Sequence, residues 1–237
     1  MPGEDAMAGM VGRRTRGMRD KHDRILVAAT VLFHERGFDG VTTQEISDRA
    51  DVAAGTLFRY ASSKSELFLM VYNEQLRAAI AAGERTAARE SDAIRAVCAL
   101  VEPIITASTD RGSAVVYQRE LLFGPPDERY RAEGLALVAR LEDAVASRLV
   151  ATVSGPESAT PSIERAAMRA ARSVFAVLNL LLVQPYTRAH PGCDVREELR
   201  EQTAQIVRGL LVSVAALDGQ QANGSTDTHG RIPTDER

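Results

Sequence analysis

The segment "TTQEISDRADVAAGTLFRYASSK" (residues 42–64) carries side chains whose types and spacing suit the binding of DNA. An aromatic ring such as Phe58 can lie against the methyl groups of thymine in the major groove. The phenol of Tyr60 and the ammonium group of Lys64 can reach backbone phosphates. Gly55, a poor residue for a helix interior, would let the backbone approach its partner closely. A small helical subdomain with Phe58 and Tyr60 in its core is the alternative, but it accounts less well for Gly55 and Lys64.

Two short helices must position these side chains. Thr42 and Glu45 have the spacing of a capping box, so a helix is expected from about Thr43 to Ala50. A short turn then leads to a second helix at about 54–60. A short helix, a tight turn and another short helix form a helix-turn-helix, which presents its second helix to a major groove.

Two longer helices would support the short ones, which are not stable alone. Apolar residues from Ile25 to Phe33 share one face of a helix that Gly37 ends with a left-handed cap. Ser63 and Glu66 have the spacing of a second capping box, which starts a long helix with apolar rows as far as Ile80.

The pattern of apolar residues in the remainder of the chain also predicts helices. No segment shows the sustained alternation of apolar and polar residues that is typical of strands. The expected helices span about 92–106, 113–122, 127–153, 162–186 and 195–217. The fold class is therefore all-α, with about nine helices in total. The domains expected along the chain are a flexible basic N-terminal arm (1–20), a three-helix DNA-binding domain (21–66), a larger ligand-binding and dimerisation domain (67–217) and a disordered tail (218–237).

The composition is that of a soluble protein with a hydrophobic core, since 45% of the residues are hydrophobic and 26% are charged. The net charge of −3 does not indicate a nucleic-acid partner by itself. Local charge can still contact phosphates, although a solvated tail without a partner is an equal alternative. Basic residues cluster near the N-terminus at Arg13, Arg14, Arg16, Arg19, Lys21 and Arg24. With no signal peptide and no apolar run of membrane-spanning length, we expect a cytoplasmic protein with no membrane partner.

The segments "ILVAATVLFHERGFDGVTTQEIS" and "DVAAGTLFRYASSKSELF" resemble the DNA-binding domain of the TetR family of transcriptional regulators. The order of helix, glycine, capped helix, turn, short helix and capped long helix matches that domain as well. The resemblance covers about residues 23–68. It implies a homodimer that binds a double-stranded DNA operator and an unknown small-molecule effector. It favours a repressor released from a palindromic operator by that small molecule.

The resemblance also implies roles for single residues. Thr43 would bind a phosphate, and Gln44 would reach a base edge from the first short helix. The backbone of the DNA would be held by Tyr60 and Lys64. The residues facing the bases would be Ala54, Gly55, Thr56 and Phe58, with Arg59 beside them.

Two positions depart from the family pattern. Ala53 stands where a capping serine is common, which leaves Asp51 as the candidate cap of the second short helix. Ala61 stands where phenylalanine is common, so the packing of the next long helix is expected to differ locally.

The last two helices, at about 162–186 and 195–217, are the expected dimer interface. The first is apolar nearly all round from Val174 to Val183 and must be covered on several sides. Paired DNA half-sites call for a symmetric dimer. Packing within one subunit is the alternative for such helices. The apolar row of the final helix consists of Leu199, Ile206, Leu210, Val214 and Leu217.

Polar residues stranded in apolar helices are candidates for an effector pocket. A buried polar group needs a partner, which a ligand can supply, although another side chain or water does so more often. The candidates are Tyr117, Asn179, Glu120 and Glu102.

Catalysis and metal binding have little support in the sequence. His190 and Cys193 have the spacing of half a metal site, but no second half is near. Cys98, in an apolar helix, fits a small core residue. We therefore expect no catalytic residue, metal or cofactor. An all-α enzyme and a helical protein-interaction module without DNA binding are the alternatives to a regulator.

Overall fold

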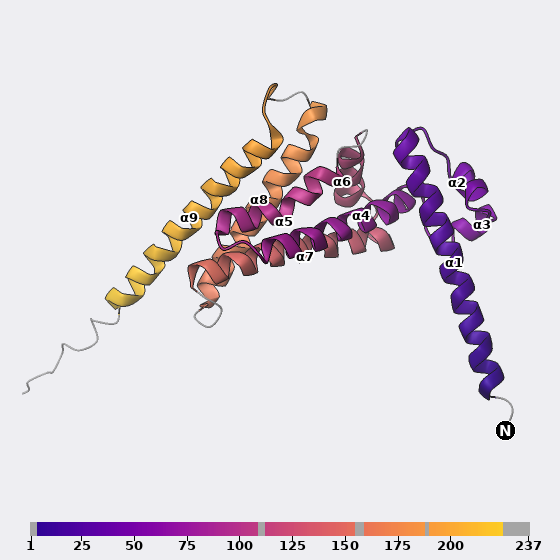
Figure 1. Cartoon of the computed structure of the whole chain (residues 1–237), viewed down its shortest axis with the longest axis horizontal. Coiled ribbons are helices and arrows are strands. Elements are labelled where there is room, and N and C mark those ends of the chain that lie inside the picture. The colour runs from indigo at the N-terminus through magenta and orange to yellow at the C-terminus, as the bar shows by residue number, and fades with distance from the viewer. Residues whose placement is uncertain (1–3, 109–111, 155–158, 188–189, 225–237) are drawn as a thin grey trace, which may run out of the picture.

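The computed structural model describes residues 4–108, 112–154, 159–187 and 190–224, with side chains from Gly17 to Ala216 inside these ranges. The helices in them confirm the all-α expectation, and these ranges contain no strand (Figure 1). The helices are α1 (Glu4–Arg36), α2 (Thr43–Arg49), α3 (Ala54–Leu57), α4 (Lys64–Ala87), α5 (Ala93–Ala107), α6 (Ser113–Phe123), α7 (Arg129–Val153), α8 (Pro161–Thr187) and α9 (Val195–Gly224).

An N-terminal unit is built from α1, α2, α3 and the first turns of α4. Its centre is aromatic: Phe68 meets Phe33 edge-on at a centroid distance of 5.2 Å and stacks on Tyr72 at 4.2 Å. Ile46 of α2 and Leu57 of α3 are fully buried in the same core. This packing holds the two short helices, which lack the length to be stable by themselves.

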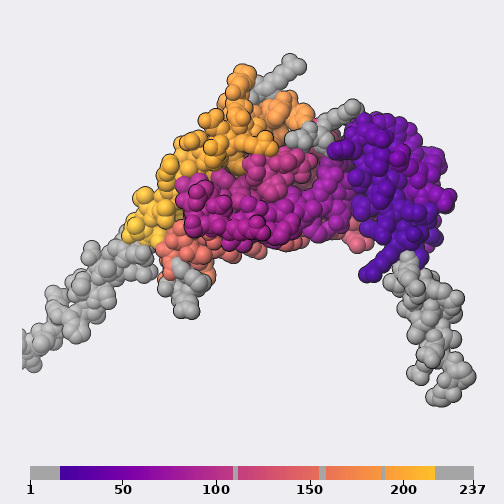
Figure 2. Space-filling model, in the orientation of Figure 1, coloured from indigo at the N-terminus to yellow at the C-terminus, as the bar shows by residue number. Residues whose placement is uncertain are grey.

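The larger body contains the rest of α4 and the helices from α5 to α9, and the N-terminal unit stands at one end of it (Figures 1 and 2). α4 joins the two parts, since Leu67 to Tyr72 belong to the first core whereas Ala79 and Ile80 belong to the second. α4 and α5 cross closely at Gly83, where a β-carbon would lie 2.3 Å from the Leu100 carbonyl oxygen. α4 is thus one continuous rod between the two cores.

Both ends of the chain are more helical than the sequence indicated. α1 begins at Glu4, within the segment expected to be a flexible arm, so residues 4–20 extend the first helix. α9 continues to Gly224, beyond the expected start of the tail at 218, and residues 225–237 lie outside the described part.

The apolar row of α9 faces the subunit's own core. Leu199, Leu210 and Val214 are buried there, and Ile206 packs against the same cluster. The side chain of Leu217 lies outside the described residues. This row therefore supplies no free dimer face, and the intramolecular alternative accounts for it.

In the described part of the chain, α8 alone is long and apolar enough to cross a membrane by length and composition, which the sequence analysis did not anticipate. One face of α8 packs into the core through Ala167, Val174 and Leu178. The opposite face leaves Leu180 55% exposed. Burial of one face is what a core helix of a globular domain requires.

Candidate nucleic-acid interface and ligand cavity

The start of α2 is fixed by a complete capping box. The Thr42 hydroxyl accepts a hydrogen bond from the Glu45 amide at 3.2 Å, and the Glu45 carboxylate accepts one from the Thr42 amide at 2.8 Å. Arg36 of α1 donates to the same carboxylate at 2.8 Å. The Thr42 amide first, and then Arg36, lower the pKa of Glu45 from 4.5 to about 2. The carboxylate thereby ties α1 to the helix-turn-helix.

The turn between α2 and α3 is held by α1 as well. Arg24 donates to the carbonyl oxygens of Ala50 and Asp51, at 3.0 and 3.1 Å, and pairs with the Asp51 carboxylate at 3.2 Å. Asp51 adopts a left-handed conformation, with φ of 51°. Ala53 is the N-cap residue of α3, and its side chain makes no capping hydrogen bond. The Asp51 carboxylate is thus engaged with α1, and the expectation that it caps α3 is wrong.

α3 is anchored by one side chain and presents the others. Leu57 is fully buried, whereas Gly55 and Arg59 are exposed and Phe58 keeps 47% of its surface exposed. A β-carbon on Gly55 would meet no atom within 4 Å in the described structure. Ala54 and Thr56 are half-buried. An exposed glycine and an exposed ring on so short a helix leave room for close approach by a partner.

The predicted contacts of α2 lie beside this surface. Thr43 is half-buried at the first position of α2. Gln44 is exposed, and its side-chain amide donates to the Asp48 carboxylate at 2.7 Å. Gln44 would have to break this hydrogen bond within the helix in order to bind the edge of a base.

Tyr60 and Lys64, the two predicted phosphate ligands, have partners within the protein. The Tyr60 hydroxyl donates to the Met18 carbonyl oxygen of α1 at 3.0 Å. The Lys64 ammonium lies 4.4 Å from the centroid of the Phe38 ring, a cation–π geometry. The N-terminal extension of α1 is thereby joined to the end of the helix-turn-helix, a contact that spacing along the sequence gave no means to anticipate.

A buried carboxylate joins the N-terminal unit to α7. One oxygen of Glu66 accepts from the Ser62 amide at 3.0 Å, and the other accepts from the Tyr130 amide at 2.9 Å in the first turn of α7. Ser63 caps α4 by accepting from the Glu66 amide, also at 3.0 Å. The Glu66 side chain therefore leaves the expected capping box incomplete and binds the loop before α4 and the first turn of α7 instead.

Asn73, which is fully buried on α4, continues this connection. Its side-chain amide donates to the Tyr130 carbonyl oxygen at 2.8 Å, and its oxygen accepts from the Tyr117 hydroxyl of α6 at 2.7 Å. Burial, and then the negative charge of Glu133, raise the pKa of Tyr117, so its hydroxyl stays protonated and remains a donor. A continuous set of hydrogen bonds thus leads from Tyr117 to the loop after α3.

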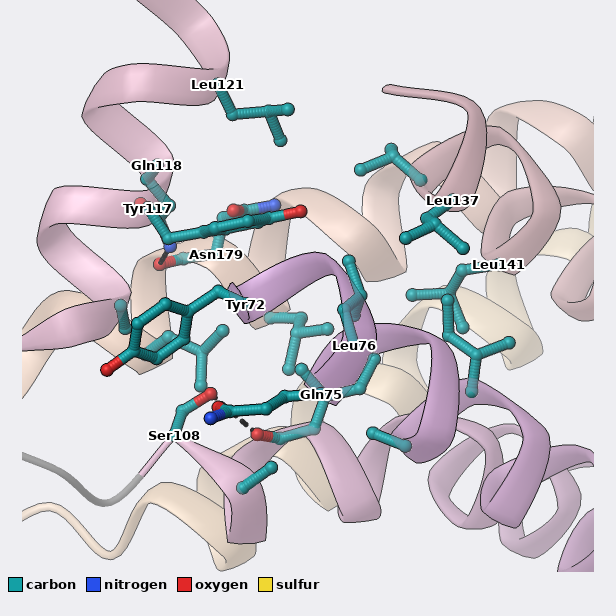
Figure 3. Close-up of a pocket in the computed structure, with 18 of the residues that line it drawn as sticks. Tyr72, Gln75, Leu76, Ser108, Tyr117, Gln118, Leu121, Leu137, Leu141 and Asn179 are labelled. Atoms are coloured by element: carbon teal, nitrogen blue, oxygen red, sulfur yellow. Dashed lines mark hydrogen bonds between the residues drawn. The ribbon is translucent and has the colours of Figure 1, made fainter. Parts of the chain in front are cut away.

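Tyr117 also lines a cavity between α4, α5, α6, α7 and α8 (Figure 3). About 720 Å³ of space lies between the lining residues, counting the part that is open to solvent. Leu76, Leu137 and Leu141 make up part of its apolar wall. Gln75, Gln118 and Asn179 are among the polar side chains in the lining.

The four pocket residues suggested by the sequence lie in different places. Tyr117 and Asn179 line the cavity, whereas Glu102 and Glu120 are not part of the lining. Glu102 pairs with Arg196 at the start of α9, and Glu120 pairs with its neighbour Arg119 at 2.6 Å. Sequence reasoning missed Tyr72 and Gln75, because a helical pattern does not distinguish a cavity wall from a packed core.

The "HPGC" loop is a turn. The Cys193 amide donates to the His190 carbonyl oxygen at 3.3 Å, and the Cys193 thiol lies 3.7 Å from the Glu198 carboxylate. Among the residues that the structure describes, no group of three or more acidic, His or Cys side chains is placed to hold a metal ion.

Comparisons with known proteins match the N-terminal unit. A family model described as "Bacterial regulatory proteins, tetR family" matches residues 25–71. The "HTH-type transcriptional activator FasR" of Mycolicibacterium smegmatis is 40% identical over 70 residues, which are 29% of this chain and 32% of that protein. The "HTH-type transcriptional repressor KstR" of Mycobacterium tuberculosis is 35% identical over 69 residues, 29% of this chain and 31% of that protein. The chain thus spans about a third of the length of these curated relatives.

The likeness to solved structures extends over the larger body. The structure of the regulator FadR from Bacillus subtilis, solved in complex with stearoyl-CoA, superposes on this chain with a TM-score of 0.55. The superposition covers 80% of this chain and 97% of the FadR chain. Only 16% of the residues are identical, so this likeness establishes the fold alone.

Proposed function

Because the chain belongs to the TetR family of bacterial regulatory proteins, we propose that it is a transcriptional repressor that a small molecule releases from a palindromic operator. The observation that carries the proposal is α3, which is anchored by Leu57 and exposes Gly55 and Phe58. A helix presented in this way fits a major groove. The protein would act in the cytoplasm.

The division of roles at the DNA follows from exposure and chemistry. Gly55 and Phe58, with Ala54 and Thr56, would approach the bases, and Arg59 would lie beside them. Thr43, Tyr60 and Lys64 would bind phosphates, which fixes the register of the protein on the duplex. The Tyr60 and Lys64 contacts with Met18 and Phe38 hold these two side chains near the interface before DNA arrives. Gln44 would reach a base edge after leaving Asp48.

We assign the dimer interface to the exposed faces of α8 and α9. Val212 of α9 is 71% exposed, and Gln205, Gly209 and Ala216 lie on the same side of that helix. Small residues let a partner helix approach closely. Leu180 of α8 is an exposed apolar residue as well. Pairing these faces by two-fold symmetry would give the two reading helices that a palindrome requires.

The cavity is the proposed effector site, and α4 is the proposed coupling element. α4 carries Lys64 at its first turn and Gln75 and Leu76 in the cavity lining. A tilt of this rod would change the spacing of the two α3 helices in the dimer. Moving a population from 1:99 to 99:1 requires a difference of about 5.5 kcal/mol in ligand binding between the two states. FadR, which shares the fold, was solved in complex with stearoyl-CoA, and this supports a ligand site in a body of this fold.

Selection from a random double-stranded DNA pool, followed by binding measurements across salt concentrations, tests this function. We expect an inverted repeat to be enriched, and its affinity to fall steeply with salt as counterions are released. Enrichment of no sequence, or binding that salt does not weaken, would contradict the proposal and favour a protein-interaction module.

A further inference from the structure

The cavity contains no charged side chain among the described residues that line it. Several charged groups on the surrounding helices form ion pairs outside the lining. Arg77 of α4 binds Glu133 of α7, Arg119 pairs with Glu120 on α6, and Glu102 of α5 pairs with Arg196 of α9. A charged ligand group enclosed here would therefore meet no counter-ion.

Most of the polar side chains that line the cavity already form hydrogen bonds within the protein. The Gln118 amide donates to the Asn179 carbonyl oxygen at 2.9 Å, and the Asn179 amide donates to the Phe175 carbonyl oxygen, also at 2.9 Å. The hydroxyls of Tyr72 and Ser113 bind each other at 2.5 Å. Each of these groups is thus held in place by the fold.

Gln75 differs from these residues. Its side-chain amide makes no hydrogen bond to any residue in the described part of the chain, although it lines the cavity from α4 (Figure 3). A carboxamide can donate and accept at once, so it suits a neutral carbonyl or hydroxyl group. The Gln75 side chain is half-buried and lines the cavity, so a ligand group that binds its amide gains specificity.

We infer that the effector is an uncharged, mainly aliphatic molecule whose carbonyl or hydroxyl group binds the side-chain amide of Gln75. The apolar wall, with Leu76, Leu137 and Leu141, takes the hydrocarbon part, and the Gln75 amide orients the polar end. An ion would lose its hydration without gaining an opposite charge. This inference rests on the proposal that the cavity is the effector site.

Calorimetric titration of the full-length protein without DNA, using four ligands with a decanoyl or decyl chain, tests the inference. The ligands are methyl decanoate, decanol, decanoate and decylammonium. We expect both neutral ligands to bind at least about tenfold more tightly than both ions at pH 7. Equal or tighter binding of either ion would overturn the ligand class while leaving the cavity as an effector site. Binding of none of the four would overturn the cavity as the site, and this inference with it.

The pH dependence of decanoate affinity provides a second test of the ligand class. Decanoate could enter by taking up a proton, so its affinity should rise about tenfold for each unit by which the pH falls from 8 to 6, since its pKa is near that of a glutamate side chain. Methyl decanoate has no group that titrates and serves as the control for changes in the protein. A decanoate affinity that does not change relative to methyl decanoate would contradict the inference.

A positive charge placed at position 75 should reverse the preference for the neutral ligand over decanoate. In Gln75→Lys, decanoate should bind more tightly than methyl decanoate, because the new ammonium group supplies the missing counter-ion. Ser91→Lys adds the same charge in the exposed connection between α4 and α5, and should keep the preference of the parent. If Gln75→Lys keeps that preference while its thermal unfolding remains cooperative, Gln75 does not contact the polar end of the ligand.

Discussion

The hydroxyl of Tyr117 donates a 2.7 Å hydrogen bond to the side-chain oxygen of Asn73, and so connects the wall of the cavity to the middle of α4. Asn73 in turn donates to the carbonyl oxygen of Tyr130, whose amide binds Glu66. Glu66 then holds the Ser62 amide in the loop that follows α3. The cavity and the DNA-reading unit are thus linked by consecutive hydrogen bonds as well as by the rod of α4.

Tyr117→Phe should weaken the effect of ligand on DNA binding more than it weakens DNA binding itself. The variant keeps the ring but leaves the Asn73 oxygen without its donor, at a cost of about 1–3 kcal/mol in stability. The measurement is operator affinity with and without a saturating ligand. Tyr72→Phe, which removes a hydroxyl from the same cavity without touching Asn73, is the control and should keep more of the ligand effect. Equal ligand effects in the two variants would exclude the hydrogen-bonded route.

Lys64→Ala should weaken binding to every DNA sequence by a similar factor and reduce the salt slope by about 0.9, the loss of one phosphate contact. The substitution also removes the cation–π contact with Phe38. Arg119→Ala controls for that loss, because the Arg119 guanidinium lies over the same ring at 5.6 Å but belongs to α6. Arg119→Ala should leave the salt slope unchanged. A change of base preference in Lys64→Ala would contradict its assignment to phosphate.

Gly55→Val should abolish operator binding and change the free energy of unfolding by less than about 1 kcal/mol. The added side chain meets no protein atom within 4 Å in the described structure, yet it would push α3 away from the floor of the groove. Gly83→Ala provides the opposite case. Its β-carbon would lie 2.3 Å from the Leu100 carbonyl oxygen, so it should destabilise the protein by about 1–3 kcal/mol. Tight operator binding by Gly55→Val would show that α3 is not the reading element.

Glu45→Gln should lower thermal stability at neutral pH and lose this effect in acid. Hydrogen bonds from the Thr42 amide and Arg36 lower the pKa of Glu45 from 4.5 to about 2. Because the folded pKa is the lower one, the stabilisation is complete above pH 4.5 and disappears as the pH falls towards 2. Unfolding of parent and variant across this range checks the expectation.

The sequence by itself determined the features that depend on residues close together in the chain. Backbone hydrogen bonds in a helix are local, so spacings of a few residues are enough to predict the helical class. The same holds for the capping box at Thr42 and Glu45 and for the left-handed conformation of Gly37. The exposure of Gly55 and Phe58 also follows, since a four-residue α3 can bury only one side and uses Leu57 for it.

Only the tertiary structure decided which surface each helix face meets. The α9 row at Leu199, Leu210 and Val214 has the pattern of an interface but fills the core, since an apolar stripe is the same whether its partner is α8 or another subunit. The Tyr60–Met18 and Tyr117–Asn73 hydrogen bonds join residues 42 and 44 positions apart. Periodicity fixes the direction of a side chain relative to its own helix, whereas its partner depends on how the helices cross, and that is set by the packing of the whole chain.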